Sequence, residues 1–267
     1  MQAVHRLLRD ELDSVARSRT WDEIQQTFEL GEPRGRRLHF SSAHRHELRE
    51  LAQRAWGFDP LVGVPEGDRR QVAASAIDEK IARERPNDRY VLVKGQLPAS
   101  LPRLTPEMSL RIPLTALHRD AISQVVVVEN LDSFDDWHAF TAPAELADSL
   151  VLYRGHGGLA HGACQLLSIL PEQISVAVFP DWDPAGLRIA HTLPRADALL
   201  LPELDHHLLA KGNREHFARQ HLAAQYLDNA ALGEWETVWD TMKAAQVSIK
   251  QQHMLALGRP LRRVARY

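Results

Sequence analysis

The feature that most constrains the fold is a series of short, mostly apolar runs in the second half of the chain. The runs are VVVVE (125–129), LVLYR (150–154), ISVAVF (174–179) and ADALLL (196–201). Stretches long enough for helices separate them. Strands that are almost continuously apolar are typical of a parallel sheet that is covered on both faces. We therefore predict an α/β fold in which this region forms a Rossmann-like, mainly parallel sheet with helices on both faces.

The first part of the chain has a different pattern. Apolar residues at helical spacing predict a helix over residues 4–17. Ser41 and Ser42 are placed to cap the start of a second helix, and Gly57 is placed to cap its end. A third helix is predicted over 69–84, and the extended segment 89–94 follows it. Short helices followed by an extended segment favour a helical or winged-helix-like module.

The chain is thus expected to have four parts. Prolines recur between Gly95 and Thr115 without any regular period, which predicts a linker or an irregular crossover. The end of the chain has a helical pattern, and its last segment, 243–267, contains Lys and Arg but no Asp or Glu. The expected parts are a helical, winged-helix-like module (1–95), a proline-rich linker or crossover (96–120), the sheet domain (121–205), and C-terminal helices with a basic tail (206–267).

Composition excludes several classes of protein. The 267 residues are 44% hydrophobic and 25% charged, which excludes a disordered or fibrous chain. The single cysteine, Cys164, excludes an internal disulfide and leaves a zinc site dependent on histidines. The N-terminal residues lack the apolar core of a signal peptide, and no apolar run approaches the roughly 20 residues that span a bilayer. We expect a cytoplasmic protein without a membrane partner.

Three acidic residues follow two of the predicted strands. Glu129 ends the first strand, and Asp181 and Asp183 follow the third in the run FPDWDPAGL. The carboxyl ends of parallel strands meet at one edge of a sheet, so these acids converge if the two strands are neighbours. Clustered carboxylates repel unless a cation neutralises them, and oxygen ligands favour Mg²⁺ or Mn²⁺. The alternative is that each acid is an ordinary strand-end residue, with Asp183 capping a helix that begins at Pro184.

The order of these motifs resembles the Toprim domain, which topoisomerases, primases and certain nucleases share. VVVVEN, LYRGHGG and DWDPAGLRIA resemble the branch related to the topoisomerase VI A subunit, above all the nuclease subunits JetD and MksG of Wadjet and MksB-type condensin systems. Gly186 fits the DxDxxG pattern of the family. The upstream runs GDRRQVAASAIDEK and DRYVLVKG are similar as well. The likeness covers roughly residues 60–205 and is strongest over 125–190.

This resemblance implies a metal-dependent endonuclease that cleaves duplex DNA in plasmid defence. It assigns Glu129, Asp181 and Asp183 as catalytic metal ligands for Mg²⁺ or Mn²⁺. It also implies SMC and kleisin subunits as partners and a nucleoid-associated location. Whether the chain forms a homodimer is left open.

One stretch departs from the family. JetD-like chains carry a further acidic pair in an EQE-like motif of a C-terminal helix. The corresponding stretch here is SIKQQHM (248–254), in which Lys250, Gln251 and Gln252 offer no carboxylate. Other acids could substitute: Glu234, Glu236 and Asp240. The alternative function is therefore a DNA-binding or SMC-docking subunit with weakened catalysis.

A third interpretation keeps the Toprim fold but assigns it to a primase or a topoisomerase. The zinc-ligand cysteines of such proteins are absent from the sequence. A topoisomerase of this branch needs a tyrosine upstream of the metal site, and Tyr90 lies on a predicted strand of alternating apolar residues. That position suits a half-buried strand aromatic, so water activated by a metal ion is the favoured nucleophile.

The net charge of -3 argues at first against a DNA partner, but the charge is unevenly distributed. Residues 121–267 hold 12 basic and 17 acidic side chains, and the last segment is purely basic. The glycine-rich run RGHGG (154–158) either cradles a phosphate or forms a tight turn before a helix. The candidate DNA-binding residues are Arg154, Lys250, Arg259, Arg262, Arg263 and Arg266.

Overall fold

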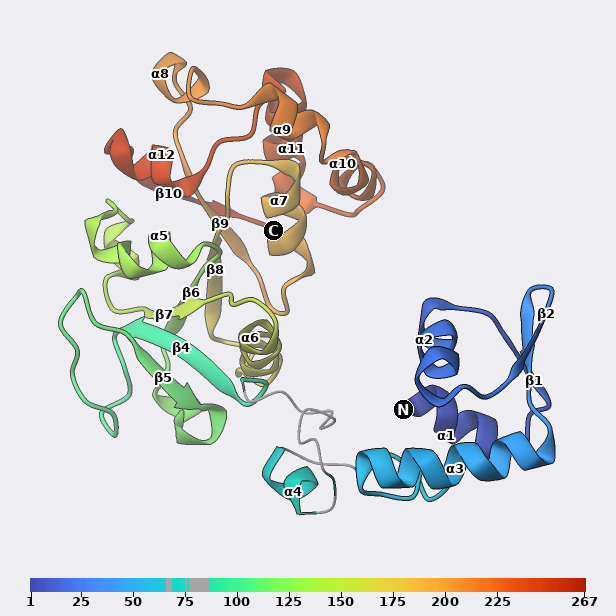
Figure 1. Ribbon diagram of the computed structural model, residues 1–267. Helices are drawn as coiled ribbons and strands as arrows, with labels where there is room; N and C mark the ends of the chain where they lie inside the picture. Colours follow the sequence, from blue (N-terminus) through green and yellow to red (C-terminus); the bar gives the residue numbers. More distant parts are fainter. Residues whose placement is uncertain (66–68, 75, 77–86) are drawn as a thin grey trace. The chain divides into compact units, whose positions relative to one another are not determined.

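The computed structural model describes residues 1–65, 69–74, 76 and 87–267 (Figure 1). The chain divides into two compact units, Met1–Pro86 and Asn87–Tyr267. Of the helix predicted over 69–84, the structure describes α4 (Arg69–Ala73), and most of the remainder lies outside the described residues. Among the described residues, no helix combines the length and the apolar character that crossing a bilayer requires.

The N-terminal unit combines helices with a small antiparallel sheet in the order β1-β3-β2. Leu7, Leu38 and Leu48 are fully buried in its core. The Ser41 hydroxyl accepts a backbone N–H of α3, and Gly57 ends this helix with a φ of 80°, so both predicted caps are confirmed. The elements before α4 are α1 (Gln2–Arg9), β1 (Ser14–Ala16), α2 (Arg19–Phe28), β2 (Glu32–Arg34), β3 (Arg37–His39) and α3 (Ser42–Trp56).

The helix predicted over 4–17 is wrong beyond Arg9. Glu11 adopts a left-handed φ of 47°, and a turn there replaces the next helical turn. Val15 then pairs with Leu38 in the small sheet. A buried β-branched side chain suits an extended strand, so the apolar spacing that mimicked a helix is shared between two elements.

The C-terminal unit is built on a seven-stranded sheet in the order β10-β9-β8-β6-β7-β4-β5. Its four middle strands pair in parallel, β7 with β6, β6 with β8 and β8 with β9. The α/β class and the mainly parallel centre of the sheet are therefore confirmed. The parallel strands coincide with the four predicted apolar runs to within a few residues: β6 (Gln124–Val128), β7 (Leu150–Tyr153), β8 (Ser175–Phe179) and β9 (Ala198–Pro202).

Three antiparallel strands extend this sheet at its two ends. They are β4 (Tyr90–Gly95), β5 (Leu110–Pro113) and β10 (Leu261–Ala265). The sequence assigned β4 to the N-terminal module, β5 to the linker and β10 to the basic tail. In the structure, their hydrogen bonds are made within the large sheet, because buried residues such as Val91, Val93 and Leu261 join its core. Of the three, β5 and β10 are edge strands, whose exposed charges hide the strand pattern, whereas β4 matches the extended segment predicted over 89–94.

Helices cover both faces of the large sheet. In Figure 1, α5 and α12 lie on one side of the strands, and α6 and α7 lie on the other. The helices of this unit are α5 (Leu131–Asp135), α6 (Gly158–Ser168), α7 (Pro184–Thr192), α8 (His206–Leu209), α9 (Arg214–Ala218), α10 (His221–Asp228), α11 (Glu236–Ala245) and α12 (Gln251–Ala256).

The chain leaves β6 and β8 in opposite directions, although these strands are neighbours. From β6 it passes through α5 to β7, and from β8 it passes through α7 to β9 on the other side of the pair. In open α/β sheets, ligands bind outside the carboxyl ends of the strands at such a point. Glu129 directly follows β6, and Asp181 and Asp183 closely follow β8, so all three acids lie at this position.

Candidate active site

Glu129 links the ends of the two neighbouring strands. Its backbone N–H donates to the Phe179 carbonyl at 3.1 Å, which continues the parallel ladder past β6. Its carboxylate accepts the Asp181 backbone N–H at 3.0 Å. Burial, reinforced by the nearby Asp181 carboxylate, raises the pKa of Glu129 to about 7. The surroundings of Glu129 therefore favour its protonated form over its carboxylate in the absence of a metal ion.

Asp181 and Asp183 are held in the turn between β8 and α7. They are only 6% and 1% exposed. Asp183 is the N-cap of α7 and accepts the Gly186 N–H at 2.9 Å, as the capping alternative predicts. A side chain at Gly186 would lie 2.3 Å from the Asp181 carbonyl, so glycine lets the helix begin directly against this turn. Gln220 donates to the other oxygen of Asp183 at 2.9 Å.

Lys250 lies between the two aspartates. Its ammonium donates to Asp181 Oδ2 at 2.7 Å and to Asp183 Oδ2 at 3.1 Å. Burial would lower the pKa of Lys250, but the contacts with both carboxylates outweigh it and the pKa is raised. Burial also raises the pKa of Asp181, against the effect of Lys250. Both shifts favour protonation, as expected where negative charge is in excess. We call Glu129, Asp181, Asp183 and Lys250 the carboxylate site.

The segment SIKQQHM is joined to this site by its backbone. Ile249 and Trp182 exchange backbone hydrogen bonds of 2.9 and 3.0 Å, and the Gln251 N–H donates to Asp181 Oδ1 at 3.0 Å. The Gln251 side chain is fully buried, donates to the Phe179 carbonyl at 2.6 Å and accepts the Asn130 N–H at 3.2 Å. Gln251 therefore ties the ends of β6 and β8 together.

Arg154 adds a positive charge beside Glu129. It follows β7, and its backbone N–H donates to the Val128 carbonyl at 2.8 Å, which places it at the same edge of the sheet. Its charge opposes the rise in the pKa of Glu129. One guanidinium nitrogen lies 3.4 Å from a ring nitrogen of His156, and its buried Nε has no hydrogen-bond partner in the described part of the chain. Arg154 thus retains an unused donor near the acids.

The glycine-rich loop after Arg154 is tightly packed. Gly155 has a φ of 82°, and a side chain there would lie 2.5 Å from the backbone of Leu159 and Ala160. Gly157 is the N-cap of α6. The structure thus has the tight strand-to-helix turn, and the prediction of a phosphate cradle stays untested.

Most of the predicted DNA contacts in the basic tail are already paired with acids or rings. Arg259 forms an ion pair with Asp205 at 2.6 Å, and Arg263 forms one with Asp197 at 3.0 Å. The Arg266 guanidinium lies over the Trp235 ring, 5.1 Å from its centre. These residues belong to a folded edge strand or lie beside it, so the predicted loose tail is corrected to β10 with its flanking turns.

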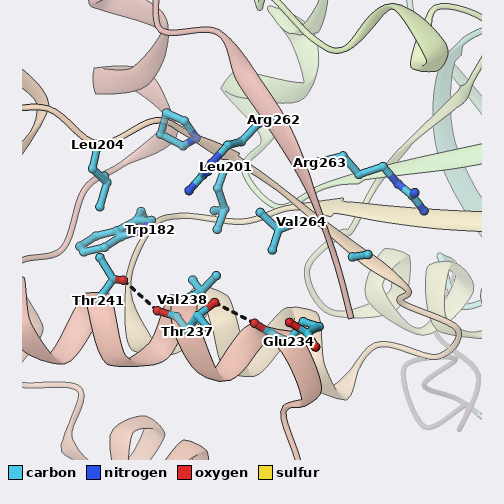
Figure 2. A pocket seen from close by; sticks show the side chains of 12 residues that line it. Trp182, Leu201, Leu204, Glu234, Thr237, Val238, Thr241, Arg262, Arg263 and Val264 are labelled. Carbon is cyan, nitrogen blue, oxygen red and sulfur yellow. Dashed lines mark hydrogen bonds between the residues drawn. The ribbon is translucent and has the colours of Figure 1, made fainter. Parts of the chain in front are cut away.

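Arg262 differs from its neighbours, because it has no ion pair among the described residues. It lines a pocket of about 540 Å³ between β10 and α11, together with Trp182, Glu234, Thr237 and Val238 (Figure 2). The hydroxyl of Thr237 is engaged with the Glu234 carbonyl at 2.9 Å. The pocket therefore presents few free polar groups around Arg262.

The acids proposed as substitutes for the missing motif lie elsewhere. Glu234 lines the pocket under β10, Asp240 forms an ion pair with Lys243 at 2.9 Å, and Glu236 is exposed. Lys250, from the segment that the resemblance aligns with the missing motif, is the residue that contacts both Asp181 and Asp183.

The donor set suits one divalent cation better than two. Within the residues that the structure covers, no group of three or more His, Cys, Asp or Glu side chains is arranged to hold a metal ion. Asp183 already accepts three hydrogen bonds, from Gly186, Gln220 and Lys250. Glu129 and Asp181 retain free carboxylate lone pairs, and Mg²⁺ is often bound through two carboxylates and several waters. These two residues therefore fit a single Mg²⁺ or Mn²⁺.

Tyr90 agrees with the strand-aromatic interpretation. It begins β4, is partly buried, and lies under the Arg111 guanidinium, 3.7 Å from the centre of its ring. A covered ring on a sheet strand is a structural position, and it adds nothing to the topoisomerase alternative.

Sequence reasoning missed the roles of Gln220 and Lys250. Gln220 lies 37 residues from the acid that it binds, and no local pattern marks it. Lys250 was noted only as a missing carboxylate and as a DNA contact, yet it is the main hydrogen-bond partner that Asp181 and Asp183 share. A lysine in the segment that the resemblance aligns with an acidic motif is the signal that could have suggested this ion pair.

Most of the C-terminal unit matches a known protein family. A family described as a domain of unknown function (DUF7281) matches residues 84–263, which is more than half of the chain. No curated protein matches the sequence.

Proposed function

The chain belongs to the DUF7281 family, and we propose that it is a metal-dependent DNA endonuclease that hydrolyses phosphodiesters with Mg²⁺ or Mn²⁺. The observation that carries this proposal is the meeting of Glu129, Asp181 and Asp183 outside the carboxyl ends of β6 and β8. Acids at such a position, with one carboxylate left uncompensated, form a site that a divalent cation stabilises. The resemblance to Toprim nucleases of the JetD and MksG type supports the choice of DNA.

Each residue of the site has a distinct role in this reaction. Glu129 and Asp181 would hold the metal ion, which would activate a water molecule and polarise a phosphate oxygen. Asp183 positions the Lys250 ammonium through its own fixed hydrogen bonds. Arg154 is partly exposed at the same sheet edge, and the outer nitrogens of its guanidinium suit contact with a DNA phosphate.

Plasmid nicking tests the proposal. Purified protein is incubated with supercoiled plasmid and Mn²⁺, and nicking by the wild type is compared with Asp181→Ala and Glu172→Gln. Glu172 is an exposed acid that precedes β8, at the opposite edge of the sheet. We expect the wild type and Glu172→Gln to nick equally and Asp181→Ala to be inactive. No nicking by the wild type, or equal nicking by all three proteins, removes the enzymatic assignment.

The biological setting follows from the same resemblance. We place the chain in a plasmid-defence or condensin system of the cell, on the nucleoid, where an SMC and kleisin complex delivers duplex DNA. The test is co-purification of the full chain with SMC and kleisin proteins encoded beside it. Failure to find such neighbours or such binding removes the defence assignment but leaves the nuclease assignment intact.

A second function is favoured by Lys250, which lies where the related nucleases have an acid. The chain would then be a DNA-binding or SMC-docking subunit with weakened catalysis. This function predicts salt-sensitive binding to duplex DNA that survives alanine at Glu129, Asp181 and Asp183 together. Loss of binding in that triple variant, with the fold retained by circular dichroism, contradicts it.

A further inference from the structure

The position of Lys250 carries an inference about the metal content of the site, which rests on the proposed metal-dependent function. We infer that the Lys250 ammonium is a resident cation between Asp181 and Asp183, and that the site consequently binds one divalent ion, held by Glu129 and Asp181, rather than two. The ammonium contacts one oxygen of each aspartate, at 2.7 and 3.1 Å. A cation that bridges two carboxylates in this way occupies the place where a second ion would lie.

The hydrogen bonds that each acid already makes also indicate that the site binds one divalent ion. A carboxylate offers about four lone-pair positions. Asp183 uses three of them, for Gly186, Gln220 and Lys250, and Asp181 uses two, for Lys250 and the Gln251 N–H. Glu129 accepts only the Asp181 N–H among the hydrogen bonds of the described residues. The free positions are therefore concentrated on Glu129 and Asp181.

Charge balance gives the same answer. Three carboxylates, the Lys250 ammonium and the nearby Arg154 guanidinium leave one negative charge when all are ionised, which one divalent ion is enough to neutralise. A second divalent ion would leave the site with a large excess of positive charge while Lys250 stays in place. Unlike charges at these distances in a poorly solvated site attract strongly, and like charges repel as strongly.

Lys250 is held at this place by its backbone. It is the N-cap of α12. The residue before it exchanges two hydrogen bonds with Trp182, and the residue after it ties β6 to β8. The side chain is 36% exposed, so its outer side remains open to solvent while its ammonium faces the acids. This anchoring distinguishes Lys250 from a surface lysine that swings into the site by chance.

Binding of Mn²⁺ to the full chain tests the inference without any reading of activity. Stoichiometry and affinity are measured by electron paramagnetic resonance and calorimetry for the wild type, Lys250→Glu and Lys250→Met. We expect one ion on the wild type, two on Lys250→Glu, and one ion bound at least about 10-fold more tightly on Lys250→Met, because a repelling charge is removed. Lys243→Met is the matched control, since Lys243 pairs with Asp240 and is expected to behave as the wild type.

The inference is overturned if the wild-type protein binds two ions or none, and this measurement does not depend on the folding of any variant. Unchanged affinity in a folded Lys250→Met protein also overturns it. The result is separable from the proposed function. One-ion binding without plasmid nicking would remove the nuclease assignment alone, whereas nicking by a protein that holds two ions would remove this inference alone.

Discussion

Two charged regions of the large sheet are built in opposite ways. In the carboxylate site, acids brought together from two strands share a single ammonium, so negative charge remains in excess. On and beside β10, a run of arginines is close in sequence, but Asp197 and Asp205 neutralise Arg263 and Arg259 one by one. A cluster of like charges in a sequence therefore does not show where a fold keeps uncompensated charge. Pairing across the sheet decides it.

The largest expected difference between the two regions is in catalysis. Asp181→Asn should lower the rate of plasmid nicking by roughly 100-fold or more, because it removes a metal ligand. Asp197→Asn removes the acidic partner of Arg263 beside β10. Because both members of this ion pair are partly exposed to solvent, the substitution should change the rate by less than about threefold. Nicking rates in Mn²⁺ measure both. Similar losses in both variants would show that the acids at the site have no special role.

The next effect is on stability, at the residue that ties the two strands together. Gln251→Leu is close in volume but leaves the Asn130 N–H without its partner and removes one of the two donors to the Phe179 carbonyl, which keeps the Glu129 N–H. An unsatisfied buried group costs about 1–3 kcal/mol and a lost hydrogen bond about 1 kcal/mol, so we expect a loss of roughly 2–4 kcal/mol in the free energy of unfolding. Gln165 is exposed and its side chain is hydrogen-bonded to His161, so Gln165→Leu provides the control. Urea unfolding of the metal-free proteins measures the difference, and a loss below about 1 kcal/mol contradicts the role of Gln251.

A smaller effect is expected from pH. The pKa of Glu129 is raised from 4.5 to about 7 in the folded protein, so the folded state binds a proton more tightly than the unfolded chain. Without metal, this group stabilises the fold below pH 4.5, relative to high pH, and the stabilisation is lost as the pH rises through 7. At about 1.4 kcal/mol per pKa unit, this rise corresponds to roughly 3 kcal/mol, so Glu129→Gln should stabilise the metal-free protein at pH 8 by up to about that amount.

The pH prediction is checked by urea unfolding at pH 5 and pH 8 in a chelator. The gain from Glu129→Gln should shrink at pH 5, where Glu129 is already protonated. Saturating Mn²⁺ should reverse the order of stability at pH 8, because the variant loses a ligand. An equal gain at both pH values would contradict the raised pKa.

The smallest effect separates two adjacent arginines of β10. Arg262 has no acidic partner among the described residues, whereas Arg263 is paired with Asp197. If DNA reaches this edge, Arg262→Ala should lower the salt dependence of DNA binding by a slope of roughly 1, and Arg263→Ala should change it less. Binding measured by anisotropy at several salt concentrations tests this. Equal slopes for both variants and the wild type would remove β10 from the DNA interface.

Local chemistry explains which parts of the fold were predictable. The strands β6 to β9 are marked by β-branched and aliphatic side chains that are buried on both faces, and the caps Ser41 and Gly57 act within one helical turn. β10 was not predictable, because its two adjacent arginines are both exposed and break the alternation that marks a strand, so the segment resembles a tail. Val15 was misassigned to a helix, because its apolar spacing fits two different elements.

The same reasoning applies to the site. The convergence of Glu129 with Asp181 was predictable, because the carboxyl ends of parallel strands lie at the same edge of a sheet. The one further condition was that β6 and β8 are neighbouring strands. Lys250 approaches Asp181 across 69 residues of chain, in a segment with no strand pattern of its own. Contacts of this kind depend on the path of the last helices, which no short motif encodes.

The hydrogen bond from the Asn130 N–H to Gln251 has a further consequence for how the protein is made. It joins residues that are 121 positions apart, and it lies beside contacts that span 52 and 69 positions. Contacts between distant positions form late, because long loops must close first. During synthesis, the parallel strands can leave the ribosome well before residue 251 does. A nascent chain would therefore contain Asp181 and Asp183 before Lys250 and Gln251 can reach them. The site would be completed only when translation of this unit is nearly finished.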